Sequence, residues 1–142
     1  MKRYPTVLTI AGSDSSGGAG IQADLKTISA HGCYGASVIT ALTAQNTTGV
    51  MGILPVSPGF VEKQLEAVLS DLHVDAVKIG MLHSPEIIHS VSKILRKYDL
   101  KQIVLDPVMI ATSGDTLMDG NVADALIGEL IPLSTLVTPN LD

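Results

Sequence analysis

The sequence has few of the residues that support disulfide, redox or metal chemistry. Cys33 is the only cysteine among 142 residues, which excludes a disulfide framework, a Cys-x-x-Cys redox pair and a cysteine-rich zinc site. We expect its thiol to be buried and unreactive. The four histidines lack the spacing of metal ligands, so we interpret them as surface or helix-end residues.

Positive charge and long apolar runs are also scarce. The formal net charge is −5, which gives no reason to expect nucleic acid as a partner. No run approaches the ~18 apolar residues that a membrane-spanning helix needs. Thr9 and Asp14 interrupt the segment after Lys2-Arg3 too early for a signal peptide. We therefore expect a soluble, cytoplasmic globular protein with no membrane partner.

Short β-branched and apolar runs alternate with helix patterns along the chain. The runs predict strands over residues 6–10, 35–40, 53–56, 76–79, 102–105 and 136–137. Most are apolar on both faces, which is typical of strands covered by helices on both sides. The alternation predicts an α/β fold, a doubly wound and mostly parallel sheet with right-handed crossovers.

Helix start signals occur between these runs. A first helix is predicted from Ile21 by apolar spacing. Ser57-Pro58 and Ser84-Pro85 each supply a capping hydroxyl and a proline at the first helical position. A weaker helix is predicted over residues 122–130. We find no internal repeat or linker.

The segment between the first predicted strand and the first helix is the most informative. Residues 11–24 read Ala-Gly-Ser-Asp-Ser-Ser-Gly-Gly-Ala-Gly-Ile-Gln-Ala-Asp. Four glycines permit positive φ and close approach of the backbone to a ligand. The first helical turn presents unpaired N–H groups and a partial positive charge. This segment therefore predicts a cradle for a polar or anionic group.

This segment does not satisfy either of two familiar nucleotide-binding motifs. Gly12 and Gly17 have the Walker A spacing, but Gly18-Ala19 stands where Lys and Ser or Thr are required. Residues 18–23 match the dinucleotide pattern G-x-G-x-x-A, yet no acid for a ribose occurs between Asp24 and Glu62. A G-x-S-x-G elbow is also missing, which disfavours a serine hydrolase.

Polar residues follow the predicted strands, at the edge where ligands bind in such sheets. Asp24 either complements the helix dipole or accepts a hydrogen bond from a ligand. Gln45 either stabilises a turn or binds the edge of a heteroaromatic ring. Lys78 either pairs with a core acid or reaches the site. Asp106 either caps a turn or orients Mg²⁺ and phosphates. These residues alone leave the reaction open.

Taken in order, five blocks resemble a known family. They are residues 11–24, Thr43-Ala44-Gln45-Asn46, Lys78-Ile79-Gly80-Met81-Leu82, Asp106-Pro107-Val108-Met109 and Thr138-Pro139-Asn140. The whole chain resembles the hydroxymethylpyrimidine and phosphomethylpyrimidine kinases of thiamine biosynthesis, members of the ribokinase-like superfamily. The resemblance implies ATP-dependent phosphorylation of 4-amino-5-hydroxymethyl-2-methylpyrimidine and then of its monophosphate, with Mg²⁺ as cofactor. Family analogy alone suggests a homodimer.

The same resemblance implies roles for individual residues. Asp24 and Gln45 would hydrogen-bond the aminopyrimidine edge. The pocket would be lined by Gly12, Ala19, Met81 and Val108. Asp106 and Asn140 would lie toward the phosphate and metal side. An acid combined with an amide that both donates and accepts suits a ring that carries an amine and nitrogen acceptors.

The resembled family is close to twice as long as this chain. It implies that the glycine-rich anion hole, the group that activates the acceptor hydroxyl and most of the adenine site lie beyond Asp142. We therefore expect residues 1–142 to be the amino-terminal part of one kinase domain, without catalytic residues and inactive alone. Two alternatives stay open: a pyridoxal kinase-like enzyme and a non-catalytic pyrimidine-binding module.

Overall fold

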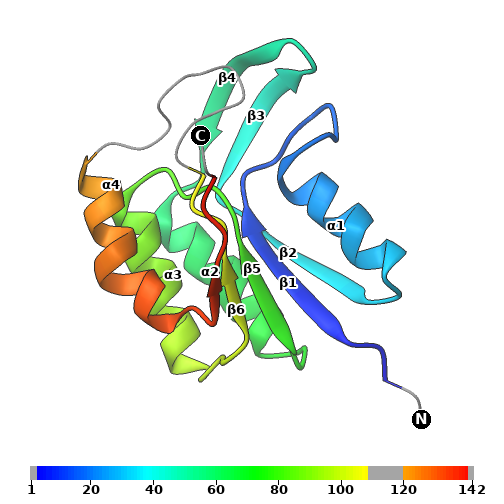
Figure 1. The fold of residues 1–142 in the computed structure, drawn as a ribbon, viewed down its shortest axis with the longest axis vertical. Coiled ribbons are helices and arrows are strands. Elements are labelled where there is room, and N and C mark those ends of the chain that lie inside the picture. The colour runs from blue at the N-terminus through cyan, green and yellow to red at the C-terminus, as the bar shows by residue number, and fades with distance from the viewer. Residues whose placement is uncertain (1–2, 109–119, 141–142) are drawn as a thin grey trace.

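The computed structural model describes residues 3–108 and 120–140, and its centre is a five-stranded sheet (Figure 1). The strand order is β2-β1-β5-β6-β7, and each neighbouring pair is parallel. The strands are β1 (Thr6–Ala11), β2 (Tyr34–Ile39), β5 (Ala76–Ile79), β6 (Ile103–Leu105) and β7 (Leu136–Val137). The predicted parallel α/β sheet is confirmed.

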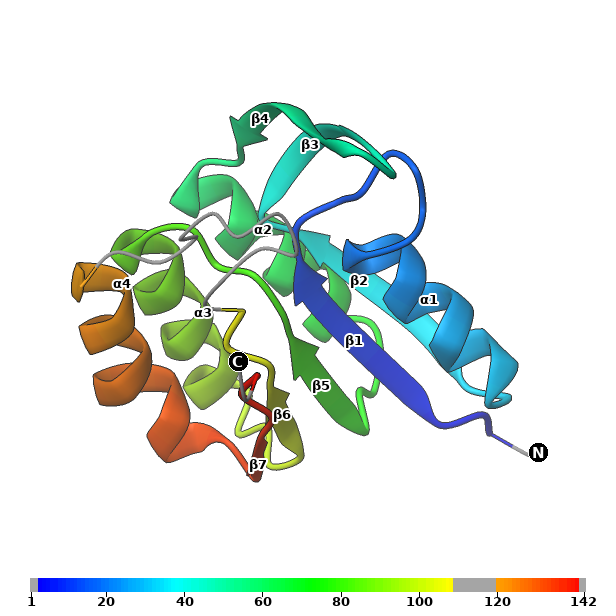
Figure 2. The same cartoon turned by 45° about the horizontal axis from the view of Figure 1, so that its top comes forward.

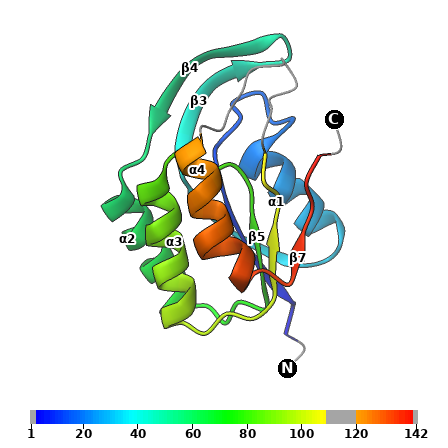
Figure 3. The same ribbon diagram turned by 60° about the vertical axis from the view of Figure 1, so that its left-hand side comes forward.

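Helices cover both faces of this sheet. Helix α1 (Gly20–Ala30) packs on β1 and β2 from one side. On the other side lie α2 (Pro58–Leu69), α3 (Pro85–Lys97) and α4 (Gly120–Ala125) (Figures 1 and 3). The weaker helix predicted over 122–130 is α4 followed by one π-helical turn, Leu126–Leu130, and then a 3₁₀ turn, Ile131–Leu133.

The predicted caps and apolar stripes explain how α2 and α3 form and pack. The Ser57 hydroxyl accepts from the N–H of Phe60, and the Ser84 hydroxyl accepts from the N–H of Ile87. Both helices then bury one apolar face against the sheet. The buried residues of the core cluster include Leu8, Ile10, Val61, Leu65, Ile79, Ile87, Val91, Leu95 and Leu105.

A separate hairpin corrects one strand prediction. Strands β3 (Ala41–Asn46) and β4 (Gly49–Pro55) pair antiparallel as a second, two-stranded sheet beyond the carboxyl edge of the parallel sheet (Figure 2). The apolar run at 53–56 therefore does not enter the buried sheet. Met51, Ile53 and Leu54 are 74%, 54% and 64% exposed. Apolar composition alone indicates a strand but does not show what covers it.

Smaller expectations about single side chains have mixed outcomes. Cys33 is partly exposed at the end of α1, so the expectation of a buried thiol is wrong. His31, His73 and His89 are exposed, as expected. His83 is half-buried, and its Nδ1 atom is buried with no hydrogen-bond partner among the described residues. Within the described ranges, no helix has the length and apolar character needed to cross a bilayer.

Candidate functional site

The strand order predicts a ligand crevice at the carboxyl ends of β1 and β5. The chain leaves β1 toward β2 on one side and later returns to place β5 on the other, which is the arrangement that opens a ligand site at the carboxyl ends of the strands. Gly12 follows β1 and Met81 lies two residues beyond β5. A Cβ atom on Gly12 would stand 3.0 Å from Met81 Cε and 3.6 Å from the carbonyl oxygen of Ala41. The structure thus brings Gly12 and Met81 together at the crevice.

The glycine loop folds back tightly on the end of β1. Gly20 has φ +57°, and a Cβ atom there would stand 2.4 Å from the carbonyl oxygen of Gly12. The same carbonyl accepts a hydrogen bond of 3.0 Å from the N–H of Ile21. Only glycine tolerates both this backbone conformation and this approach. Gly20 therefore fixes where helix α1 begins relative to the crevice.

The backbone amides of the loop are paired with Asp14. One carboxylate oxygen of Asp14, which is 2% exposed, accepts from the N–H and hydroxyl of Ser16 at 2.8 and 2.7 Å. The other accepts from the N–H groups of Gly18 and Ala19 at 3.0 and 2.8 Å. These amides precede the first turn of α1, so the chain supplies its own anion to the loop just before the helix, and within that turn the N–H of Ile21 is also paired. These bonds, the Ser16 hydroxyl first, hold the pKa of Asp14 below its ordinary value against the opposing effect of burial.

Two serines join the glycine loop to strand β3. The N–H of Ser13 donates to the carbonyl of Ala41, and the Ser13 carbonyl accepts from the hydroxyl of Thr43 at 2.7 Å. The Ser15 hydroxyl donates to the carbonyl of Gln45 at 2.6 Å and accepts from its N–H at 2.8 Å. The glycine loop therefore lies beside β3, and its hydrogen bonds fix the backbone of Gln45 next to the loop.

Gln45 lies within strand β3, whereas we expected it to follow a strand. The β3–β4 register shifts between Ala44 and Gln45, and such bulges turn a side chain away from the regular alternation. The Gln45 side chain is partly buried, and its Oε1 accepts from the hydroxyl of Thr43 at 3.3 Å. No hydrogen bond among the described residues joins Gln45 to Asp24.

Asp24 forms an ion pair on the inner side of helix α1. Its Oδ2 atom accepts from Lys78 Nζ at 2.9 Å and from the Thr9 hydroxyl at 2.6 Å. The side chains of Lys78 and Asp24 are 29% and 19% exposed. Of the two alternatives for Lys78, pairing with an acid is confirmed. That acid is Asp24, itself one of the predicted site residues. The sequence did not indicate that these two residues would pair.

The residues predicted for the phosphate side follow β6 and β7. Asp106 donates its N–H to the carbonyl of Ile79, and Val108 turns back onto the Asp106 carbonyl. Asn140 is exposed after β7, the next strand in the sheet. Three strand spacings separate β1 from β7, about 14 Å. Met109 of the fourth block lies outside the described residues.

The metal-binding potential of this edge is limited. No group of three His, Cys, Asp or Glu side chains that could hold a metal occurs in residues 3–108 and 120–140. The Asp106 carboxylate receives no hydrogen bond from a described residue and is partly buried. Because Mg²⁺ is usually bound by one or two carboxylates together with substrate phosphates, a single aspartate fits this ion as a partial ligand.

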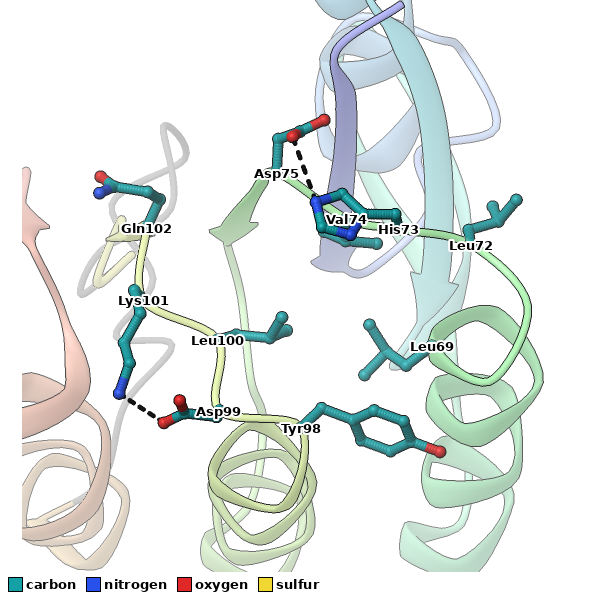
Figure 4. Close-up of a pocket in the computed structure, with 10 residues that line it drawn as sticks. All are labelled: Leu69, Leu72, His73, Val74, Asp75, Tyr98, Asp99, Leu100, Lys101 and Gln102. Atoms are coloured by element: carbon teal, nitrogen blue, oxygen red, sulfur yellow. Dashed lines mark hydrogen bonds and ion pairs between the residues drawn. The ribbon is translucent and has the colours of Figure 1, made fainter. Parts of the chain in front are cut away.

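A hollow of appreciable volume lies away from the predicted site residues. A cavity of about 420 Å³ opens at the amino ends of β5 and β6, beside the carboxyl ends of α2 and α3 (Figure 4). Its lining residues are Leu69, Leu72, His73, Val74, Asp75, Tyr98, Asp99, Leu100, Lys101 and Gln102. None of the residues predicted for the site is among them.

Comparisons with known proteins show which family of enzymes the chain resembles. A protein-family model described as phosphomethylpyrimidine kinase matches residues 14–142. A hydroxymethylpyrimidine/phosphomethylpyrimidine kinase of Rhizobium meliloti is 60% identical over 94% of this chain and 50% of its own length. The corresponding kinase of Escherichia coli is 52% identical over 99% of this chain and 53% of its own length.

Solved structures of kinases have the same fold over nearly the whole of this chain. The phosphomethylpyrimidine kinase of Clostridium difficile 630 has a TM-score of 0.91 and 55% identity, covering 96% of this chain and 59% of that one. The pyridoxal kinase of Staphylococcus aureus in complex with pyridoxal has a TM-score of 0.87 and 39% identity, covering 99% and 50%. The chain spans about half the length of the curated kinases that it matches. It belongs to the phosphomethylpyrimidine kinase family.

Proposed function

We propose that this chain is the pyrimidine-binding part of an ATP-dependent, cytoplasmic kinase of thiamine biosynthesis. The substrates are 4-amino-5-hydroxymethyl-2-methylpyrimidine and its monophosphate. The observation that carries this proposal is the close approach of Met81 to Gly12 at the carboxyl ends of β1 and β5, in a chain that belongs to a pyrimidine kinase family. We further propose that residues 1–142 form the amino-terminal part of a single kinase domain and are inactive alone.

Recognition of the ring follows from the chemistry of two side chains. Asp24 offers a carboxylate acceptor for the exocyclic amine, and the Gln45 amide both donates to and accepts from ring-edge groups. A buried hydrogen bond to such a ring contributes about 1–3 kcal/mol, which is enough to discriminate against an analogue without the amine. Gly12, Ala19, Met81 and Val108 would line the ring, with the Met81 thioether offering a favourable contact to an aromatic face.

The phosphate side is proposed to lie beyond β6 and β7. Asp106 would hold Mg²⁺ together with phosphate oxygens, and Asn140 would donate to a phosphate. Mg²⁺ supplies neutralisation of phosphate charge when it is bound. Phosphoryl transfer depends on positioning and charge stabilisation, and we assign no catalytic residue within this chain. Among the structural relatives, the Staphylococcus aureus pyridoxal kinase has been solved with AMP-PCP and with ADP.

A homodimer is a further proposal about partners. The exposed Met51, Ile53 and Leu54 of β4 support it, because contiguous exposed apolar surface marks interaction sites. Sedimentation equilibrium tests it, and a monomer across the accessible concentration range would contradict it.

A pyridoxal kinase-like activity is the second candidate. It is favoured by the TM-score of 0.87 with the pyridoxal-bound Staphylococcus aureus enzyme. The identities, 39% with that enzyme against 55% and 60% with two pyrimidine kinases, favour the pyrimidine. The third candidate, a binding module without catalysis, predicts pyrimidine affinity without turnover in any longer form of the protein.

Calorimetry and a turnover assay separate these candidates. We expect the 142-residue chain to bind 4-amino-5-hydroxymethyl-2-methylpyrimidine more tightly than pyridoxal, and to show no steady-state ATP-dependent phosphorylation. Tighter binding of pyridoxal would favour the second candidate. Robust phosphorylation by this chain would contradict the proposal that it is inactive alone.

A further inference from the structure

The Asp24 ion pair has an asymmetry that bears on ligand recognition. We propose that Lys78 and Thr9 are positioning residues, which bind one carboxylate oxygen of Asp24 and so leave the other free to accept the amine of the pyrimidine. The inference rests on the proposed pyrimidine site and deepens it. It assigns the selectivity for an amino group to a three-residue arrangement rather than to Asp24 alone.

Both donors bind the same oxygen. The Thr9 hydroxyl and the Lys78 ammonium lie 2.6 and 2.9 Å from Asp24 Oδ2. No donor from the described ranges, 3–108 and 120–140, bonds Oδ1. Since a carboxylate has two oxygens and about four acceptor positions, Asp24 keeps half of its accepting capacity for a ligand.

The two donors come from neighbouring strands at the same level of the sheet. Thr9 in β1 is aligned with Lys78 in β5, and both side chains reach Asp24 of helix α1, which packs on β1 and β2. Thr9 is fully buried, so its hydroxyl is held in place by the packing around it. The carboxylate is therefore fixed by two rigid strands rather than by a flexible surface lysine alone.

Gly80 provides the room for the lysine head group. A Cβ atom on Gly80 would stand 3.0 Å from Lys78 Nζ and 3.0 Å from Ala11 Cβ. The ammonium thus lies at the level of the carboxyl ends of β1 and β5, beside the crevice that Met81 contacts. A structural ion pair within the sheet would have no need of this position at the ligand edge.

Ligand selectivity distinguishes positioning from plain structural support. The probes are 4-amino-5-hydroxymethyl-2-methylpyrimidine and the same ring without the 4-amino group, each titrated calorimetrically into the 142-residue chain. Lys78→Met removes the charge at nearly constant length. Lys101→Met, at the opposite edge of the sheet, is the matched control. Thr9→Val removes one hydroxyl at nearly constant shape, and Thr9→Ser restores it.

We expect Lys78→Met to weaken binding of the amino ligand about tenfold, the equivalent of one charge-assisted hydrogen bond, while affinity for the analogue changes less than about twofold. Thr9→Val is expected to lose about threefold for the amino ligand alone, and Thr9→Ser to recover it. Lys101→Met should behave as the unmodified chain does.

Each contrary result has a distinct meaning. If Lys78→Met is folded by circular dichroism and keeps the unmodified preference for the amino ligand, the positioning role is overturned while the proposed site stands. If Lys78→Met does not fold, the Thr9→Val and Thr9→Ser pair decides, and equal preference in both overturns the inference. If the unmodified chain binds neither ligand, the proposed pyrimidine site itself is contradicted and the inference falls with it.

Discussion

The two edges of the parallel sheet differ in how their polar groups are used. At the carboxyl edge, the Asp14 side chain binds the loop amides, and Ser13 and Ser15 bind the backbone of β3. At the amino edge, a hollow of about 420 Å³ is lined by leucines and by charged side chains such as Lys101, which pairs with Asp99 (Figure 4).

The two edges thus differ in that one offers a hollow and the other offers ordered polar groups. The amino edge has volume but presents exposed charges that already pair with each other, as Lys101 does with Asp99. The carboxyl edge instead holds glycines in close contact with neighbouring atoms and a carboxylate that is fixed by hydrogen bonds. We propose that backbone crowding and preorganised polar groups, rather than volume, mark the ligand site in this chain. The predictions below test that contrast.

The largest stability effect is expected at Gly20. Gly20→Ala should lower the free energy of unfolding by about 3 kcal/mol, through left-handed backbone strain and overlap with the Gly12 carbonyl. Gly32 also has positive φ, but a Cβ atom there would meet nothing within 4 Å. Gly32→Ala should therefore cost about 1 kcal/mol, from strain alone. Urea unfolding measures the free energy of unfolding of both variants. Equal decreases in the two would show that the close approach of Gly20 to the Gly12 carbonyl adds nothing to the effect of strain.

A pair of glutamines compares the two edges directly. Gln45→Ala should weaken pyrimidine binding more than about tenfold, because it removes ring-edge hydrogen bonds. Gln102→Ala, in the lining of the amino-edge hollow, should leave the calorimetric dissociation constant unchanged. Unaltered binding in Gln45→Ala would refute the assignment of Gln45, and a loss in Gln102→Ala would transfer the site to the other edge.

The half-buried His83 predicts a pH dependence of stability. Burial lowers the pKa of His83, with a smaller opposing effect from Glu86. The unfolded chain then binds a proton that the folded chain resists, so stability is full above the ordinary histidine pKa of about 6.5 and falls as the pH drops below it. Unfolding between about pH 7.5 and 5.5 measures this loss.

Two variants attribute that loss to one histidine. His83→Gln should flatten the fall in stability, whereas His73→Gln, an exposed histidine at the amino edge, should retain it. If His83→Gln keeps the full pH dependence, another group is responsible.

The smallest effect is expected at the amino edge. Asp99 has φ +53° just after helix α3, a position that favours glycine. Asp99→Gly should raise the free energy of unfolding by about 0.5–1 kcal/mol, because the relief of strain exceeds the loss of an exposed ion pair. Lys101→Ala removes the same ion pair without relieving strain, so it should lower stability slightly. A loss of stability in Asp99→Gly would mean that the ion pair outweighs the strain.

Local signals made much of the fold predictable. Serine and proline at 57–58 and 84–85 mark two helix starts, and the structure shows both hydroxyls capping as expected. Buried parallel strands are continuous apolar runs, which is why β1 and β5 were recognised. The same signal misplaced the run at 53–56, because an exposed hairpin and a buried strand have similar composition when the covering partner is unknown.

The sequence indicated which edge of the sheet carries the candidate site, but not which side chains bond to one another there. Gly12 and Met81, which the resemblance groups in one pocket, lie beside each other in the structure. The role of Asp14 was missed, although an aspartate followed by Ser-Ser-Gly-Gly is a known way for a side chain to bind nearby backbone amides. The Asp24–Lys78 pair joins residues 54 positions apart, and such a partner depends on the strand order, which local sequence does not specify.

The most direct test of the central claim is a ¹⁵N-edited NMR titration of this chain with 4-amino-5-hydroxymethyl-2-methylpyrimidine. The account predicts that the amide shifts change at Gly12, Ala19, Gln45 and Met81, while those of Leu100 and Gln102 stay in place. Changes centred on Leu100 and Gln102, or no changes at saturating ligand, would contradict a pyrimidine site at the carboxyl edge of β1 and β5.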